Sequence, residues 1–159
     1  MGILSNTKFN GYHYFLCIVD DYARAVWVYL PKDKIEVYGK IVRFCSMVKT
    51  QFDISVQKMR CDNGTEFTNE PLQAYLPEHR ILQEISYVDT PQQNRWVERK
   101  NCHILNVARV LRFQASLSIK FWGECVLTAA HLINRIPTKL LDLKTPYEGL
   151  FGVNQIIKM

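Results

Sequence analysis

The order in which strand-like and helix-like segments follow one another is the feature that most restricts the fold of this 159-residue chain. Residues 12–19 and 25–30 are rich in aromatic and β-branched side chains, which predicts two strands joined as a hairpin. Later segments predict helices over 34–52, 69–77, 97–112 and 119–135, strands over 56–60 and 81–87, and a last short helix that begins at Thr145-Pro146. Mixed strands with interleaved helices predict an α/β layered fold.

Two of these helices have clear apolar patterns. The helix over 119–135, which Ser118 can cap, is apolar nearly all round, so we expect it to be well buried. The pattern over 34–52 predicts one apolar face formed by Ile35, Tyr38, Ile41, Val42, Cys45 and Val48. The polar residues 90–95 predict a loop before the long helix over 97–112.

Composition narrows the class of protein. Hydrophobic residues make up 48% of the chain and charged residues 22%, which is typical of a globular domain. No window approaches the roughly 18 apolar residues of a membrane span, and no secretory signal pattern is seen, so we expect a nuclear or cytoplasmic protein. Five cysteines without a C-x-x-C pair predict reduced, mostly buried thiols. The net charge of +5 suits a polyanionic partner.

Two polar stretches carry candidate chemistry. Residues 60–67 read Arg-Cys-Asp-Asn-Gly-Thr-Glu-Phe, and residues 90–101 read Thr-Pro-Gln-Gln-Asn-Arg-Trp-Val-Glu-Arg-Lys-Asn. Taken alone, the first predicts a turn, because Asn-Gly is a strong turn signal, and the second predicts a loop and a helix start. Taken together, they place Asp62 at the end of a predicted strand and Glu98 in the first turn of the long helix.

At these stretches the sequence resembles the integrase catalytic core of copia-type LTR retrotransposons and, more distantly, the retroviral integrases. That family has a D-N-G-x-E-F stretch and, thirty-five residues after its Asp, the Glu of a P-Q-x-N-G-x-x-E-R stretch. Residues 15–27, 121–124, 132–137 and 145–152 are similar to further family segments, so the resemblance runs over about 11–152. It implies an RNase H-like mixed sheet flanked by helices.

The resemblance also implies a function. The family carries out 3′-end processing of element DNA and its strand transfer into host DNA, with Mg²⁺ or Mn²⁺ in a two-metal site. Asp62 and Glu98 would be the catalytic metal ligands. Gln92, Gln93 and Asn94 would form a mobile loop that touches DNA, and Arg99 and Lys100 would lie towards its phosphates. The implied partners are element ends, target DNA and a second copy of the core, with neither a membrane nor a small-molecule substrate.

Several positions depart from the family pattern. The family's first catalytic Asp lies in a D-x-x-G-P segment on the first strand, and residues 1–7 do not contain it. We therefore expect an N-terminal remnant over 1–10, an incomplete core over 11–152 whose first strand is partly or wholly missing, and a tail over 153–159, with impaired catalysis. Arg95 stands at the family's loop glycine, Trp96 at a usually small apolar residue and Cys102 at a frequent arginine.

Asp20 and Asp21 are an alternative source of metal ligands, although they match the family's second-strand pair. We favour a structural role for them, in which they cap the turn and pair with Arg24. Three other functions stay open for the chain as a whole. It could be a non-catalytic DNA-binding module, a self-associating domain that uses the helix over 119–135, or an RNase H-like nuclease of another type.

Overall fold

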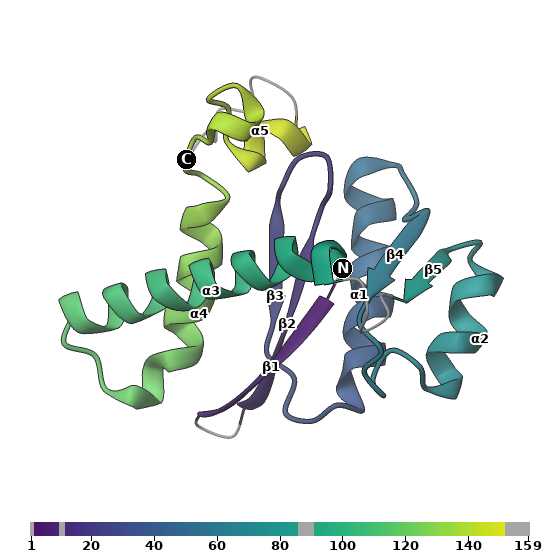
Figure 1. Cartoon of the computed structure of the whole chain (residues 1–159), viewed down its shortest axis with the longest axis horizontal. Coiled ribbons are helices and arrows are strands. Elements are labelled where there is room, and N and C mark those ends of the chain that lie inside the picture. Colours follow the sequence, from purple (N-terminus) through teal and green to yellow (C-terminus); the bar gives the residue numbers. More distant parts are fainter. Residues whose placement is uncertain (1, 10–11, 86–90, 152–159) are drawn as a thin grey trace.

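The computed structural model describes residues 2–9, 12–85 and 91–151, and it has the mixed α/β architecture that the sequence predicts (Figure 1). Five strands and five α-helices are described, with two short 3₁₀ helices at Ile119–Phe121 (η1) and Lys139–Leu141 (η2). In chain order the main elements are β1 (Gly2–Phe9), β2 (Tyr12–Val19), β3 (Val26–Tyr29), α1 (Glu36–Phe52), β4 (Lys58–Cys61), α2 (Glu70–Glu78), β5 (Leu82–Ile85), α3 (Pro91–Gln114), α4 (Trp122–Ile133) and α5 (Pro146–Phe151).

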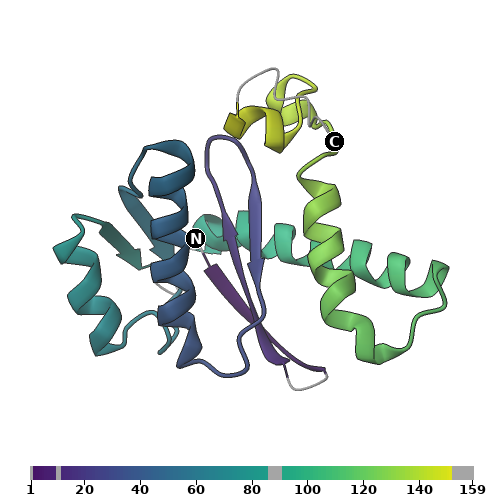
Figure 2. The ribbon, with the colours of Figure 1, turned by 180° about the vertical axis from the view of Figure 1, so that it is seen from behind.

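The strands form two groups that lie next to each other. The first is an antiparallel sheet in the order β1-β2-β3, and the second is the parallel pair β4-β5. Strand β1 contacts β4 and so joins the two groups. Helix α3 crosses in front of the strands in Figure 1, whereas α1 lies in front in the view from behind in Figure 2. The helices therefore cover both faces.

The side chains of β2 point alternately to the two faces of the sheet and so divide the hydrophobic core between them. Leu16 and Ile18 pack against α1, α2 and β4, whereas Phe15 and Cys17 pack against α3 and α4. Successive side chains of a strand point to opposite faces, so the continuous apolar run of β2 supplies both halves of the core. This central position fits the unbroken run of aromatic and β-branched residues in β2.

A cavity of about 690 Å³ lies on the α1 side of the strands. Its apolar wall comes from β2, β3 and α1, including Ile18, Trp27 and Phe44, and it reaches β4 at Met59. The hydrogen-bonded ladders of the described residues do not run across from β1 to β4.

Several element predictions are confirmed. Strand β2 has the predicted bounds, and α2 lies close to the predicted range 69–77. Asn69 caps α2 by accepting a hydrogen bond from the Leu72 amide at 3.0 Å. The cysteines are free thiols and all are buried except Cys102. Apart from these predictions, the described part of the chain contains no helix that could span a membrane.

The largest correction concerns the N-terminus. Residues 2–9, which the sequence analysis set apart as a remnant before an incomplete sheet, form strand β1 and pair with β2 from Gly2 opposite Ile18 to Phe9 opposite Tyr12. The expectation that the first strand is wholly missing is therefore wrong. Backbone pairing with β2 makes this segment a strand, although polar Ser5, Asn6 and Lys8 interrupt its apolar residues. The predicted tail over 153–159 lies outside the described residues.

Three helix predictions were also inaccurate. Helix α3 begins at Pro91, so residues 91–95 are helical and not a loop. On α1 the buried face includes Val37 and Phe44, and the predicted Ile35 is 85% exposed. The predicted helix over 119–135 is a 3₁₀ turn followed by α4, whose Leu127 is 44% exposed, so it is not buried all round.

Asn134 ties the end of α4 to β3. Its Oδ1 accepts a hydrogen bond from the Val26 amide and its Nδ2 donates one to the Val26 carbonyl, both at 2.8 Å. Replacing Asn134 with alanine leaves both backbone groups of the buried Val26 without this partner. We expect the free energy of unfolding to fall by about 2–3 kcal/mol, measured by urea denaturation.

The matched control is Asn106→Ala, because Asn106 lies on the exposed side of α3, where its Oδ1 accepts a hydrogen bond from Arg109. Its loss should change the free energy of unfolding by less than about 0.5 kcal/mol. An equal effect of the two substitutions would contradict the tying role of Asn134.

Candidate active site

Asp62 directly follows β4, and buried core residues precede and follow it in the chain. Cys61 before it is buried, and Phe67, which closes the following turn, is fully buried. Within the turn the Gly64 amide donates to Asp62 Oδ1 at 3.1 Å, and the Phe67 amide donates to the Gly64 carbonyl at 2.9 Å. The half-buried Asp62 carboxylate is thereby fixed at a strand end, as the sequence analysis predicts for its position.

Burial and the neighbouring groups shift the pKa of Asp62 in opposite directions. Burial is the main cause that raises the pKa of Asp62 above its usual range, and the nearby Glu66 carboxylate also raises it. The hydrogen bond from the Gly64 amide and the positive charge of Lys34 lower the pKa. A bound cation would favour the charged form further.

Glu66 and Lys34 form an ion pair beside Asp62. Lys34 Nζ donates to Glu66 Oε2 at 2.8 Å, and the Glu66 side chain is only 4% exposed. A methyl group placed on Gly64 would lie 2.7 Å from Glu66 Oε1 and 3.0 Å from Asp62 Oδ1. Carboxylate oxygens of Asp62 and Glu66 therefore face each other across the space of one methyl group, which only glycine leaves open at position 64.

The sequence analysis missed the roles of both residues of this pair. Glu66 lies inside the quoted 60–67 stretch, next to the apolar Phe67, and that neighbour is the signal that could have indicated its burial. Lys34 lies 32 residues earlier, just before α1, and no local pattern connects it with the turn.

Glu98 lies on α3, on the side away from the sheet contacts. Val97, Asn101, Ile104 and Ala108 form the buried face of this helix, and Glu98 is exposed. Because α3 begins at Pro91, Glu98 lies about two turns into the helix and not in its first turn, as the sequence analysis expected. Among the described residues, no three acidic, histidine or cysteine side chains form a group that could hold a metal ion.

The predicted DNA-contacting residues all belong to α3. Gln92, Gln93 and Asn94 are helical, so the expected mobile loop is not found at these positions. Arg99 is exposed, whereas Lys100 is half-buried. Burial is the main cause that lowers the pKa of Lys100, and the positive charge of Arg24 adds to it. Arg99 is thus the better placed of the two for a phosphate.

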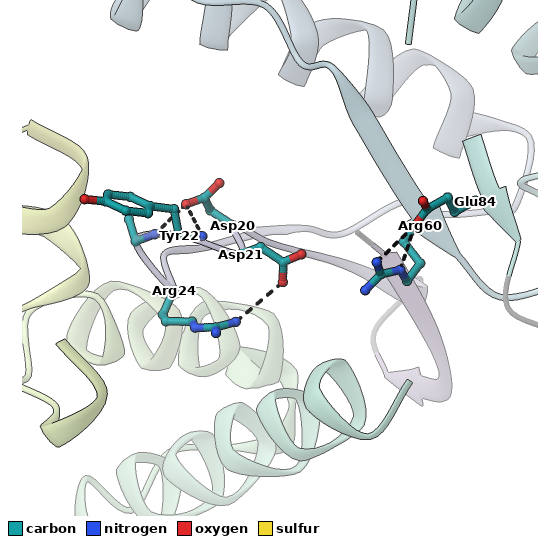
Figure 3. A network of polar contacts seen from close by, with 7 residues as sticks. Asp20, Asp21, Tyr22, Arg24, Arg60 and Glu84 are labelled. Atoms are coloured by element: carbon teal, nitrogen blue, oxygen red, sulfur yellow. Dashed lines mark hydrogen bonds and ion pairs between the residues drawn. The ribbon is translucent and has the colours of Figure 1, made fainter. Parts of the chain in front are cut away.

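Asp20 and Asp21 have the structural role that the sequence analysis favoured (Figure 3). Asp20 Oδ2 accepts hydrogen bonds from the amides of Tyr22, at 3.1 Å, and Ala23, at 2.6 Å, which closes the turn between β2 and β3. Arg24 Nη1 lies 3.4 Å from Asp21 Oδ1. Figure 3 also shows the ion pair of Arg60 with Glu84, which links neighbouring positions of β4 and β5.

Comparison with known protein sequences gives close relatives over most of this chain. It is 36% identical over 143 residues to the retrovirus-related Pol polyprotein from transposon RE2 of Arabidopsis thaliana, and 34% identical over 145 residues to that from transposon TNT 1-94 of Nicotiana tabacum. These alignments cover 90% and 91% of this chain. The chain spans 10% and 11% of the length of these relatives. No protein-family model matches the chain.

Solved structures show the same fold at low sequence identity. The HTLV-2 integrase catalytic core domain in complex with magnesium has a TM-score of 0.71 and 18% identity, covering 94% of this chain and 93% of that one. The simian T-cell lymphotropic virus intasome in complex with the PP2A regulatory subunit B56 gamma contains a chain with a TM-score of 0.76 and 16% identity. That match covers 98% of this chain and 54% of the other.

Proposed function

We propose that this chain, which belongs to the integrase-core segment of copia-type retrotransposon Pol polyproteins, derives from a domain that acts on DNA phosphodiester bonds in end processing and strand transfer, and that it binds DNA with impaired catalysis. The observation that carries this proposal is the position of Asp62, a half-buried carboxylate fixed at the end of β4 in an integrase-type fold. The DNA ends of the element and the target DNA would be its substrates, within the nucleus or cytoplasm.

The described residues fit part of a magnesium site. Carboxylate oxygens are the ligands that Mg²⁺ and Mn²⁺ prefer, and Asp62 supplies one such group beside the Glu66 carboxylate. The proposal assigns Asp62 and Glu98 as the metal ligands. The bound ion would supply activation of the attacking oxygen and stabilisation of the leaving one. Asp62 would contribute a charged group already held in place by the Gly64 amide.

We further propose that this 159-residue chain is catalytically weak by itself. Within the described part of the chain, no group of three or more acidic, histidine or cysteine side chains that could hold a metal ion is found. A two-metal reaction depends strongly on the position of each ligand, since small misplacements lower the rate by large factors. Arg95 and Trp96, within the second motif, add bulk where the family pattern is small.

In this proposal DNA lies along α3. Arg99 and Lys100 would contact phosphates, and Gln92, Gln93 and Asn94 would lie near the cut. The net charge of +5 supports attraction of a polyanion. Such contacts neutralise phosphates and release counterions, so the affinity should fall steeply as salt rises.

A non-catalytic, self-associating module is the second candidate, and the surface around α4 favours it. Large apolar side chains are exposed there, including Phe121, Leu127 and Leu132. Exposed apolar side chains are available for contacts between protein copies. A homodimer through this surface is compatible with DNA binding along α3.

The test is a plasmid-nicking assay with Mg²⁺ or Mn²⁺, run together with DNA-binding measurements by fluorescence anisotropy. We expect no nicking that depends on Asp62 when the wild-type chain is compared with Asp62→Asn. We also expect metal-independent DNA binding that weakens with salt, and an affinity about tenfold lower in Arg99→Gln near 0.1 M salt. The matched control Lys139→Gln removes the same charge at η2 and should bind like the wild type.

Two outcomes would contradict parts of this proposal. Nicking that disappears in Asp62→Asn would establish the family chemistry and refute catalytic weakness. Absence of DNA binding by the folded protein, or equal binding by Arg99→Gln and the wild type, would refute the proposed DNA contact along α3.

A further inference from the structure

Lys34 brings a positive charge to the candidate metal site from a distant part of the chain. It precedes α1, and its Nζ contacts Glu66 Oε2 at 2.8 Å in the turn after β4. The Glu66 side chain is 4% exposed, whereas that of Lys34 is 45% exposed. A carboxylate buried to this degree needs a counter-ion, because the loss of hydration strongly disfavours an unpaired charge.

The same ammonium group also acts on Asp62. The pKa of Lys34 is raised, mainly by the hydrogen bond with Glu66, and the charge of Asp62 contributes to this shift. Oxygens of Asp62 and Glu66 both lie within 3.0 Å of the methyl position of Gly64. A cation that binds Asp62 on this side would therefore meet the Glu66 carboxylate and the Lys34 ammonium together.

We propose that Lys34 competes with divalent cations for the carboxylates of Asp62 and Glu66. Its ammonium group neutralises Glu66 and repels an ion at Asp62. These two carboxylates therefore bind Mg²⁺ or Mn²⁺ weakly while Lys34 contacts Glu66. This inference rests on the proposed function, in which Asp62 is a metal ligand. It assigns Glu66 as a carboxylate that becomes available to the ion when the lysine withdraws. The positive charge of Lys34 then limits the affinity of the site for the divalent ion.

The direction in which metal affinity changes when Lys34 is removed distinguishes competition from a purely structural role. If Lys34 only stabilised the turn, its removal would disturb Asp62 and weaken metal binding. If Lys34 competes with the ion, its removal strengthens metal binding. A unit charge and a divalent ion about 5 Å apart in a water-like medium repel each other enough to change the affinity about tenfold.

The experiment measures Mn²⁺ binding to the full chain by electron paramagnetic resonance, with circular dichroism as the check on folding. We expect Lys34→Met to bind Mn²⁺ about tenfold more tightly than the wild type. Lys34→Arg keeps the charge and should bind like the wild type. Adding Asp62→Asn to Lys34→Met should abolish the binding.

Glu66→Gln provides a second, independent variant. It keeps the shape of the side chain and a hydrogen-bond acceptor for Lys34, but it removes one carboxylate and leaves the ammonium charge unbalanced. We expect Mn²⁺ to bind several-fold more weakly than to the wild type. Unchanged binding would contradict the role of Glu66, even if Lys34→Met proves too unstable to measure.

The outcomes distinguish this inference from the proposed function. If no variant binds Mn²⁺ in a way that depends on Asp62, the metal role of Asp62 itself fails. If binding depends on Asp62 but Lys34→Met binds no more tightly than the wild type, the competition by Lys34 is refuted while the metal role of Asp62 stands.

Discussion

Replacing Phe67 with alanine is expected to lower the free energy of unfolding by about 3–5 kcal/mol. Phe67 is fully buried among side chains of β2, α1, β4 and α2, and it lines the existing cavity of about 690 Å³. The substitution removes the apolar ring and enlarges a space that the surrounding elements already leave open. Urea denaturation followed by circular dichroism measures the change.

The control is Phe113→Ala, because Phe113 is 68% exposed near the end of α3. It removes the same atoms from a surface position and should change the free energy of unfolding by less than about 0.5 kcal/mol. A loss below about 1 kcal/mol for Phe67→Ala would mean that the turn after β4 is not anchored by the core.

The expected effect of Phe67→Ala extends to the candidate site, because the turn and the core share this residue. The Phe67 carbonyl accepts hydrogen bonds from Gln83 Nε2 at 2.7 Å and Gln73 Nε2 at 3.2 Å. Its amide closes the turn onto the Gly64 carbonyl. The packing of Phe67 in the core therefore fixes the relative positions of Asp62, Gly64 and Glu66.

Sequence patterns predicted the central elements well, because there the local preference and the tertiary environment agree. Strand β2 is buried on both faces, and its unbroken run of apolar residues indicates this burial. Strand β1 shows the opposite case. Polar Ser5, Asn6 and Lys8 interrupt the apolar residues of this segment, and pairing with β2 supports its strand conformation.

The start of α3 differs from the sequence prediction for a different reason. The polar residues Gln92, Gln93 and Asn94 favour a loop, and the family pattern also has a loop there. Pro91 is typical of the first position of a helix, and Gln and Arg are good helix formers. The sequence therefore also contains a signal for the helix that begins at Pro91.

For the candidate site, the sequence could place Asp62 but not its charged neighbours. A carboxylate at the end of a strand can be predicted from local pattern, since β4 and the Asn-Gly turn are adjacent in the chain. The contact between Lys34 and Glu66 joins two loops through the packing of α1 against β4. Such a pair has no periodic spacing, so only the folded arrangement reveals it.

The last prediction concerns which acidic residue binds the divalent ion. Asp62→Asn should weaken Mn²⁺ binding beyond about 30-fold, because the proposal makes this carboxylate a direct ligand and a neutral amide oxygen is a far poorer one. The amide keeps the size of the side chain and can still accept the hydrogen bond from the Gly64 amide. Electron paramagnetic resonance of Mn²⁺ reports the affinity without requiring catalysis.

Asp20→Asn is the matched control, since Asp20 is the alternative ligand and its carboxylate already accepts two hydrogen bonds from the amides of Tyr22 and Ala23. An amide oxygen can accept the same bonds, so we expect the turn to persist and the Mn²⁺ affinity to stay within about twofold of the wild type. If Asp20→Asn abolished binding while Asp62→Asn did not, the ligand assignment would pass to the turn between β2 and β3. In that case Lys34 and Glu66 would be only an ion pair that holds the turn after β4.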